Sequence, residues 1–334
     1  MGDLLTIDTY NAAALAAIDA FGLDVRDVRP ISKTENVVFR IEEAQTGQLF
    51  ALRLHRPDYN ALDTLVSERA WTSALAGAGM IVPTGRQARN GDWYVPIATP
   101  DAAQWRYAGI TVWHQGRTVE SLIGTERGPE TWPWFQRLGE LLGDLHTNTE
   151  HWTIPSGFVR HSLDIAGLAG EKPFWGRFWE SACLDADERS LLGAAREWVI
   201  GELGNLQREG APFGLIHADG HLDNVLISGD RLGLIDFDDC AFGWHVFDFA
   251  VSLHSSWPSE HFGAIRDHFL AGYASRRPLP HNVLEQLDLF LLIRSLMLVS
   301  WREMRPDITG NMQKALWMPK LVRDVQHALN NNRI

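Results

Sequence analysis

The chain has 334 residues, of which 45% are hydrophobic and 22% are charged. These proportions are typical of an ordinary folded protein and exclude intrinsic disorder, a collagen-like repeat and a coiled coil. Lys and Arg number 30 against 42 Asp and Glu, for a formal net charge of −12. This balance argues against nucleic acid or an anionic membrane as a partner, and the length predicts two lobes or domains.

The cysteines and the N-terminus predict a cytoplasmic protein. Cys183 and Cys240 are too few for a disulfide framework or a four-thiolate zinc site, so we expect both to be buried thiols. Asp3 and Asp8 stand where a secretory signal carries Lys or Arg. The longest apolar run, residues 289–301, is interrupted by an arginine and is too short to cross a bilayer, which predicts a buried helix.

The first third of the chain predicts a small sheet with helices. Apolar residues recur at helical spacing over residues 7–21, and a second helix is expected over residues 62–76, ending near Gly77. Strands are expected at residues 25–31, 37–41, 49–54, 85–88 and 93–97, with Thr46-Gly47 and Asn90-Gly91 as turn signals. Residues 109–116 then predict a single segment that connects this part to the rest.

Longer helical periods replace this pattern from about residue 133. Helices are expected at residues 134–146, 185–206, 260–274, 283–302 and 312–329, the last broken or kinked at Pro319. Short strands are expected at residues 213–216, 225–227 and 232–235. The predicted fold is therefore α+β, with a β-rich domain over residues 1–112 and a mostly helical domain over residues 113–334. Ligands usually bind in the cleft of such a pair of lobes.

Two motifs in the second half carry recognisable chemistry. His217, Asp219 and Asn224 have the spacing of the kinase catalytic loop, H-x-D followed by four residues and N, and a predicted strand follows directly. Asp236 begins an Asp-Phe-Asp sequence at the end of the next strand, where kinases place a metal-binding aspartate. The residue types and the predicted strands agree with phosphoryl transfer.

Phosphoryl transfer also explains what these side chains would do. An aspartate beside the nucleophilic hydroxyl orients it and accepts its proton, so Asp219 is the candidate catalytic base. Mg²⁺ takes oxygen ligands and bridges the phosphates, which suits Asn224 and Asp236. Asp238 is a candidate for an additional ligand, and His217 is expected to orient the loop by hydrogen bonding.

The chain resembles the aminoglycoside phosphotransferase and choline kinase superfamily, whose signature is similar to H-G-D-x-H-x-x-N followed by I-D-F/W-D/E. Ala218 stands where Gly is usual, and Gly220 stands where Leu is common. The similarity covers nearly the whole chain and is closest to homoserine kinase type II and stress-response kinase A-like proteins. It implies a protein-kinase-like two-lobed fold, with ATP and Mg²⁺ as cofactors. Five residues match the signature: His217, Asp219, His221, Asn224 and Asp236.

The resemblance also implies nucleotide-binding residues in the first lobe. Arg53 occupies the position of the usual phosphate-contacting Lys, and Glu68 occupies that of its ion-pair partner. Arginine is always charged and binds phosphate in bidentate fashion, so it can replace the electrostatic role of Lys. The phosphate loop has no glycine. The phosphates are expected to be covered by Ser32, Lys33 and Thr34, and adenine is expected to lie against Val112, Trp113 and His114.

We therefore expect an ATP-dependent phosphotransferase that acts on a hydroxyl of a small molecule, such as an amino alcohol, a hydroxy amino acid or a sugar. An aminoglycoside or other antibiotic kinase and a nucleotide-binding pseudokinase are the alternatives. The residues alone also allow a metal hydrolase built on His217, Asp219 and His221. Only twelve positions separate Asp236 from Asp248, and no Ala-Pro-Glu follows, which argues against a protein kinase.

The sequence allows two roles for Arg294 and for four of the tryptophans. Arg294 either binds an acceptor carboxylate or pairs with an internal acid. Asp248 is expected to accept backbone hydrogen bonds that hold the catalytic loop. Four tryptophans either line the acceptor pocket or pack in the core: Trp175, Trp179, Trp244 and Trp301. The sequence indicates neither the identity of the acceptor, nor a preference for ATP over GTP, nor the oligomeric state.

Overall fold

The computed structural model describes residues 7–34, 36–101, 105–125, 127–305 and 313–331. The chain folds into two compact units. The first comprises residues 1–118, 152–160 and 226–238, and the second comprises residues 119–151, 161–225 and 239–334. Two segments that follow residue 118 in the sequence, 152–160 and 226–238, thus belong to the first unit. A single boundary between residues 112 and 113 does not include them.

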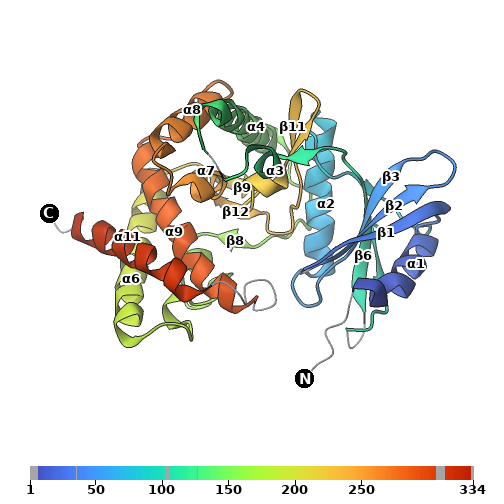
Figure 1. Ribbon diagram of the computed structural model, residues 1–334, viewed down its shortest axis with the longest axis horizontal. Helices are drawn as coiled ribbons and strands as arrows, with labels where there is room; N and C mark the ends of the chain where they lie inside the picture. Colours follow the sequence, from blue (N-terminus) through green and yellow to red (C-terminus); the bar gives the residue numbers. More distant parts are fainter. Residues whose placement is uncertain (1–6, 35, 102–104, 126, 306–312, 332–334) are drawn as a thin grey trace. The chain divides into compact units, whose positions relative to one another are not determined.

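The first unit is built on an antiparallel sheet (Figure 1). The strand order is β1-β2-β3-β6-β4, and β5 pairs with β6. The helices of this unit are α1 (Asn11–Ala20), which follows a 3-10 turn at Ile7–Tyr10, and α2 (Leu62–Gly77). The strands are β1 (Val25–Lys33), β2 (Val37–Glu43), β3 (Leu49–Leu54), β4 (Gly85–Arg86), β5 (Tyr94–Ile97) and β6 (Arg106–Val112).

One face of this sheet packs in the hydrophobic core and the other lines a cavity, because successive residues of a strand point to opposite sides. In β3, Phe50, Leu52 and Leu54 are buried in a hydrophobic core together with side chains of α1. Ala51 and Arg53 alternate with them and line a cavity instead. β6 alternates between the core and the same cavity. The strand period therefore places a charged residue of β3 in the cavity while its neighbours complete the core.

A second, small sheet brings a distant segment into the first unit. It has the order β11-β10-β7, formed by β11 (Arg231–Leu234), β10 (Val225–Ser228) and β7 (Arg117–Thr118). Gly116 precedes β7, and a Cβ atom there would lie 2.3 Å from the carbonyl oxygen of Ile227. After β11, the ring of Phe237 packs edge-on against Trp71 of α2, with 5.4 Å between the centroids. This packing holds Asp236 in the same unit as Arg53.

The second unit is mostly helical. Its sheet has the order β8-β12-β9, formed by β8 (Ser162–Leu163), β12 (Ala241–Trp244) and β9 (Phe213–Ile216). The β-rich first unit and the helical second unit agree with the expected α+β class. The helices are α3 (Val119–Ile123), α4 (Trp132–His151), α5 (Ile165–Ala169), α6 (Ala186–Glu209), α7 (His245–Leu253), α8 (Phe262–Ala274), α9 (Val283–Glu303) and α11 (Met318–Asn331).

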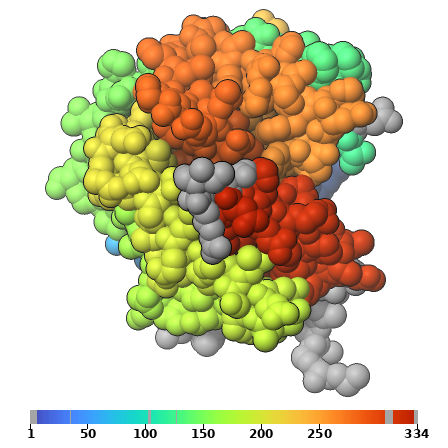
Figure 2. All heavy atoms as spheres, turned by 90° about the vertical axis from the view of Figure 1, so that its left-hand side faces the viewer, coloured from blue at the N-terminus to red at the C-terminus, as the bar shows by residue number. Residues whose placement is uncertain are grey.

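The C-terminal helices α9 and α11 follow the sequence prediction. The apolar run over residues 289–301 lies within α9 and is largely buried, as expected. α11 packs against α6 and α9 (Figure 2). The expected helix is broken beside Pro319, as predicted: a 3-10 turn at Lys314–Leu316 comes first, and Pro319 is the second residue of α11. Proline is tolerated in the first turn of a helix, where its missing N–H has no intrahelical acceptor. Met312, where the helix was expected to begin, lies outside the described residues.

Two further expectations concern exposure. Cys240 is buried, but Cys183 is exposed, which corrects the prediction of two buried thiols. Three of the four tryptophans with two interpretations are buried and therefore belong to the packed interior: Trp175, Trp179 and Trp244. Over the residues that the structure describes, none of the helices has both the length and the apolar character that crossing a membrane requires.

Candidate active site

A cavity of about 360 Å³ lies within the first unit, on the face of the sheet that α1 does not cover. Apolar side chains such as Val38, Ala51 and Leu226 form part of its wall, with a few charged groups among them. Small-molecule sites usually have this composition. Six of the residues predicted from the sequence line this cavity: Arg53, Glu68, Val112, Trp113, His114 and Asp236.

Arg53 joins two carboxylates of the segment that follows β11. Its Nη1 lies 2.9 Å from Oδ1 of Asp236 and 2.8 Å from Oδ1 of Asp238. Burial opposes the charge of Arg53, but Asp236 and Asp238 outweigh it, so the pKa of Arg53 is raised. Burial likewise opposes the charge of Asp238, but Arg53 and then His55 lower the pKa of that carboxyl. The cavity therefore contains a fixed positive charge beside the candidate metal ligand.

Glu68 does not form the expected ion pair with Arg53. Within the described part of the chain, the ion pairs of Arg53 are those with Asp236 and Asp238. Oε2 of Glu68 is buried and has no hydrogen-bond partner. Burial, followed by the charge of Asp238, raises the pKa of Glu68 to about 7. The two aspartates thus take the place at Arg53 that was predicted for Glu68.

The segment after β6 forms part of the cavity wall. The N–H of Val112 donates to the carbonyl of Thr84 at 2.9 Å, and the N–H of Trp113 donates to the carbonyl of Leu49 at 3.0 Å. The Nε2 atom of His114 lies 2.9 Å from the carbonyl oxygen of Val82. No acceptor for the His114 backbone N–H is found among the residues described. Of the three residues expected to contact adenine, His114 therefore has the available amide.

Ser32, Lys33 and Thr34 are not among the cavity-lining residues. The Nζ atom of Lys33 lies 5.8 Å from the centroid of the Tyr10 ring, and the Thr34 N–H donates to the carbonyl of Asn36 at 3.1 Å. A register shift between Pro30 and Ser32 interrupts the pairing of β1 with β2. Such a shift changes which face of the sheet the following side chains occupy.

The predicted catalytic loop lies in the second unit and surrounds Asp219 with donors. Arg294 of α9 donates from Nη2 to Oδ1 of Asp219 at 2.9 Å. Asn224 donates from Nδ2 to Oδ2 at 3.1 Å, and Nε2 of His221 lies 3.4 Å from the same oxygen. Burial opposes the charge of Asp219, but the hydrogen bond with His221 and the charge of Arg294 outweigh it, so the pKa of Asp219 is lowered. Arg294 thus pairs with an internal acid, and that acid is the candidate base.

A second aspartate, Asp248 of α7, holds the backbone of this loop. Its Oδ2 accepts from the N–H of His217 at 3.0 Å, and its Oδ1 accepts from the N–H of Ala218 at 2.7 Å. The N–H of Asp219 lies 3.3 Å from Nδ1 of His217. Both expectations for this loop are met, since Asp248 accepts backbone hydrogen bonds and His217 orients the backbone of Asp219.

Comparison with known proteins identifies the family. A model of the phosphotransferase enzyme family matches residues 27–286. The chain belongs to this family. Homoserine kinase from Pseudomonas aeruginosa (strain LESB58) is 35% identical over 154 residues, which is 43% of each of the two chains. The alignment thus spans less than half the length of that relative.

Solved structures extend the comparison over nearly the whole chain. A microcompartment-associated aminopropanol kinase is 28% identical, with a TM-score of 0.74 and coverage of 94% of both chains. Amicoumacin kinase hAmiN, in complex with AMP-PNP, Ca²⁺ and Ami, has a TM-score of 0.75 and covers 96% of this chain and 93% of its own. Its 18% identity shows the fold alone. The family and the kinase-like fold expected from the sequence are confirmed, and the expected class of enzyme agrees with the family.

The two predicted magnesium ligands of this phosphotransferase have the chemistry that the ion requires. Nδ2 of Asn224 is oriented by its hydrogen bonds to the Asp219 carbonyl at 2.9 Å and to the Asp219 carboxylate. The amide oxygen of Asn224 therefore points away from these acceptors, and no donor to it is found in the described residues. Asp236 presents a partly exposed carboxylate in its own unit. Both are hard oxygen donors, which Mg²⁺ prefers.

The metal-hydrolase alternative has no support from the structure. The described residues contain no group of three or more His, Cys, Asp or Glu side chains with the arrangement of a metal site. His217 is wholly buried, and its Nδ1 faces the backbone of the loop. Within the described structure, His217 thus contacts the backbone of its own loop.

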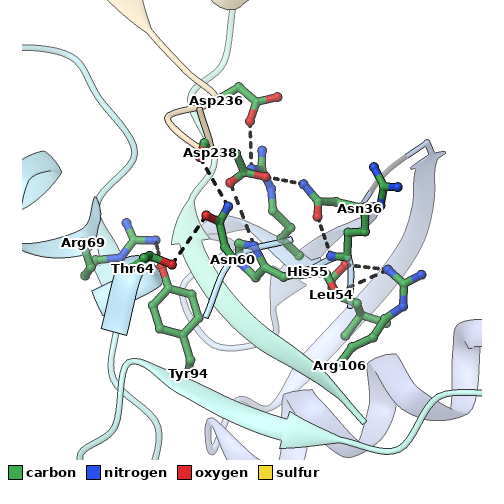
Figure 3. Close-up of polar contacts among 12 residues, drawn as sticks. Asn36, Leu54, His55, Asn60, Thr64, Arg69, Tyr94, Arg106, Asp236 and Asp238 are labelled. Atoms are coloured by element: carbon green, nitrogen blue, oxygen red, sulfur yellow. Dashed lines mark hydrogen bonds and ion pairs between the residues drawn. The ribbon is translucent and has the colours of Figure 1, made fainter. Parts of the chain in front are cut away.

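Sequence reasoning missed several polar partners of Asp238. Figure 3 shows the amide of Asn36 directed toward Asp238, to which Nδ2 donates at 2.5 Å. The carbonyl of Asp238 accepts from Asn60 at 3.3 Å and from Arg160 at 2.5 Å. Arg160 comes from the segment 152–160 that returns to the first unit. No local pattern marks these residues, because each acts on a residue far away in the sequence.

Proposed function

We propose that this protein is an ATP-dependent phosphotransferase that moves the γ-phosphate of ATP to a hydroxyl of a small molecule. The proposal is supported above all by the cavity of the first unit, where Arg53, Asp236 and the backbone of His114 lie around one space. A guanidinium binds phosphate oxygens in bidentate fashion. The His114 N–H offers a hydrogen bond to the edge of a purine base, and the apolar wall suits its faces.

Asp219 performs the proton chemistry in this proposal. The hydroxyl oxygen of the acceptor attacks the γ-phosphorus, the bond from that phosphorus to the oxygen of ADP breaks, and the hydroxyl proton passes to Asp219. Oδ2 of Asp219 faces both Asn224 and His221, whereas Oδ1 accepts from Arg294. A carboxylate oxygen has two lone pairs, so Oδ1 retains the capacity to receive a substrate hydroxyl. The lowered pKa of Asp219 keeps it ionised and ready to accept the proton.

Asn224 and Asp236 are the proposed magnesium ligands. When bound with the nucleotide, Mg²⁺ neutralises the negative charge that accumulates on the phosphates during transfer. The orientation of the Asn224 amide by Asp219 and the position of Asp236 beside Arg53 support this assignment. The complex of amicoumacin kinase hAmiN with AMP-PNP and Ca²⁺ is consistent with a nucleotide and a divalent cation in this fold.

A pair of measurements tests the proposal. Thermal unfolding of the protein with and without Mg-ATP measures nucleotide binding, and a coupled assay measures ADP formation with a panel of amino alcohols, hydroxy amino acids, sugars, choline and aminoglycosides. We expect ATP to raise the melting temperature of both wild type and Asp219→Asn, whereas only the wild type gives acceptor-dependent ADP. Equal ADP formation by the two proteins, with binding intact, would instead favour a nucleotide-binding module without transfer activity.

A further inference from the structure

The guanidinium of Arg294 contacts the candidate base but uses little of its hydrogen-bonding capacity. Its side chain is only 12% exposed, and Nη2 donates to Oδ1 of Asp219 at 2.9 Å. Within the described part of the molecule, the Arg294 side chain donates to Asp219 and to no other protein acceptor. A guanidinium carries five N–H donors in a planar fork. Most donors of this largely buried cation are therefore left for a ligand beside Asp219.

Other basic side chains lie close enough to Arg294 to interact with it electrostatically. Burial, and then the charge of Arg294, lower the pKa of Arg302, which lies eight residues further along α9. Burial followed by the charges of Arg294, Lys320 and Arg302 lowers the pKa of His254 to about 3. Lys320 is paired with Asp324 at 2.6 Å. Among the described residues, the carboxylate in contact with Arg294 is that of Asp219.

We propose that Arg294 binds a carboxylate of the phosphate acceptor, so that the acceptor is a short hydroxy acid or hydroxy amino acid. This inference rests on the proposed transfer to a hydroxyl held at Asp219. A carboxylate on the unused edge of the guanidinium forms two parallel hydrogen bonds, as arginine–carboxylate pairs commonly do. Nη2 of the Arg294 guanidinium already contacts Asp219. A hydroxyl two or three carbons from the acceptor's carboxylate therefore reaches Asp219, the candidate base. The product is the phosphate monoester of the hydroxy acid, with ADP released.

An acceptor that lacks an anionic group fits this arrangement less well. An amino alcohol would place its ammonium group near Arg294 and Arg302 and would leave the remaining donors of Arg294 without a charged partner. Buried or partly buried charges that lose their partner are costly. Arg294 thus acts as a specificity-determining residue that selects between acids and their decarboxylated counterparts.

Three pairs of acceptors that differ by one carboxylate test the inference: serine and ethanolamine, threonine and 1-aminopropan-2-ol, homoserine and 3-aminopropan-1-ol. ADP release with Mg-ATP is measured for each compound. We expect at least one acid to exceed its decarboxylated counterpart in kcat/KM by about 10-fold or more, the effect of one charge-assisted contact. Equal values within every pair, or a general preference for the decarboxylated member, would overturn the inference.

The variant Arg294→Gln separates recognition of the acceptor from an effect on Asp219. We expect kcat/KM for the acid to fall about 10- to 100-fold, mainly through KM, while the decarboxylated member changes far less. Arg294→Lys retains part of the preference because it keeps the charge without the fork. Arg323→Gln, an exposed arginine of α11, is the matched control and leaves both members unchanged. An equal loss for both members in Arg294→Gln would mean that Arg294 acts only through Asp219 or the transferred phosphate.

Failure of the proposed function would be recognised separately. Without any acceptor, slow ATP hydrolysis that is lost in Asp219→Asn reports the transfer chemistry itself. Calorimetric titration with serine, threonine and homoserine reports binding without turnover. If ATP hydrolysis is independent of Asp219, the proposed function fails, and Arg294-dependent binding of an acid would still support a carboxylate site. If the transfer chemistry is present but no acid binds or reacts, the inference about Arg294 fails alone.

Discussion

Asp248 accepts a hydrogen bond from the N–H of Ala218 at 2.7 Å, and Ala218 has a left-handed backbone conformation with φ of 64°. This conformation costs a residue with a Cβ atom about 1–2 kcal/mol. A wholly buried carboxylate therefore holds a strained residue directly before the candidate base, Asp219. The relationship explains why glycine is usual at this position of the family signature and how alanine is tolerated here.

Asp248→Asn is expected to destabilise the protein by about 2 kcal/mol and to reduce kcat strongly. The N–H groups of His217 and Ala218 each face a different oxygen of Asp248. Either orientation of an asparagine amide would place its NH₂ against one of these donors. Chemical denaturation and the ADP assay measure the two effects. Tyr273→Phe is the control, because it removes only the hydroxyl that lies 2.9 Å from Nδ1 of His146. Comparable losses in the two variants would show that the loop does not depend on the carboxylate.

Gly139→Ala is expected to destabilise the second unit by about 1–3 kcal/mol or more. α4 and α8 approach closely at this position, and a Cβ atom on Gly139 would lie 2.0 Å from the carbonyl oxygen of Phe269. A backbone atom cannot move aside as a flexible side chain can. Gly201→Ala on α6 is the matched control, with no atom within 4 Å of its Cβ, and should stabilise the helix by up to about 1 kcal/mol. A melting temperature of Gly139→Ala at or above that of the wild type would contradict this packing.

The elements of the fold and the catalytic loop could be predicted because their signals are local. Strand alternation in β3 and the His-Asp-Asn spacing each depend on a few neighbouring residues. The partner of Arg53 could not be predicted in this way. Asp236 and Asp238 lie 183 and 185 residues further along the chain, and their position depends on the packing of the segment after β11 in the first unit.

The phosphate loop shows a second limit of prediction. The order Ser32-Lys33-Thr34 indicates side chains able to contact phosphate, but the register shift after Pro30 decides the face on which they lie. Registers and bulges depend on pairing with another strand, which one sequence does not reveal.

Glu68→Gln is expected to make the pH dependence of stability weaker. Burial raises the pKa of folded Glu68 from its ordinary value of 4.5 to about 7. Between these values the unfolded chain has lost the proton that the folded chain still holds, so wild-type stability falls as the pH rises from about 4.5 to about 7. The variant carries no such charge and should gain up to about 3 kcal/mol over the wild type above pH ~7, but nothing near pH ~4.5.

Chemical denaturation at about pH 4.5 and about pH 8, without nucleotide, measures this difference. Glu209→Gln, an exposed glutamate at the end of α6, is the control and should shift stability little at either pH. A stability difference between wild type and Glu68→Gln that does not change with pH would show that Glu68 is not the buried, unpaired acid described here.

Arg53→Met is expected to weaken ATP binding by about 10-fold or more and to destabilise the first unit by about 1–3 kcal/mol. The variant leaves two neighbouring carboxylates without their cation, and the side chain of Asp238 is only 13% exposed. The double variant Arg53→Met/Asp238→Asn removes one of these charges and should recover much of the stability. It should not recover ATP affinity, because the phosphate-binding guanidinium is still missing. Calorimetry with AMP-PNP beside thermal unfolding separates the two effects. If the double variant recovers both, Arg53 serves only to neutralise the aspartates, and the phosphates must be bound elsewhere.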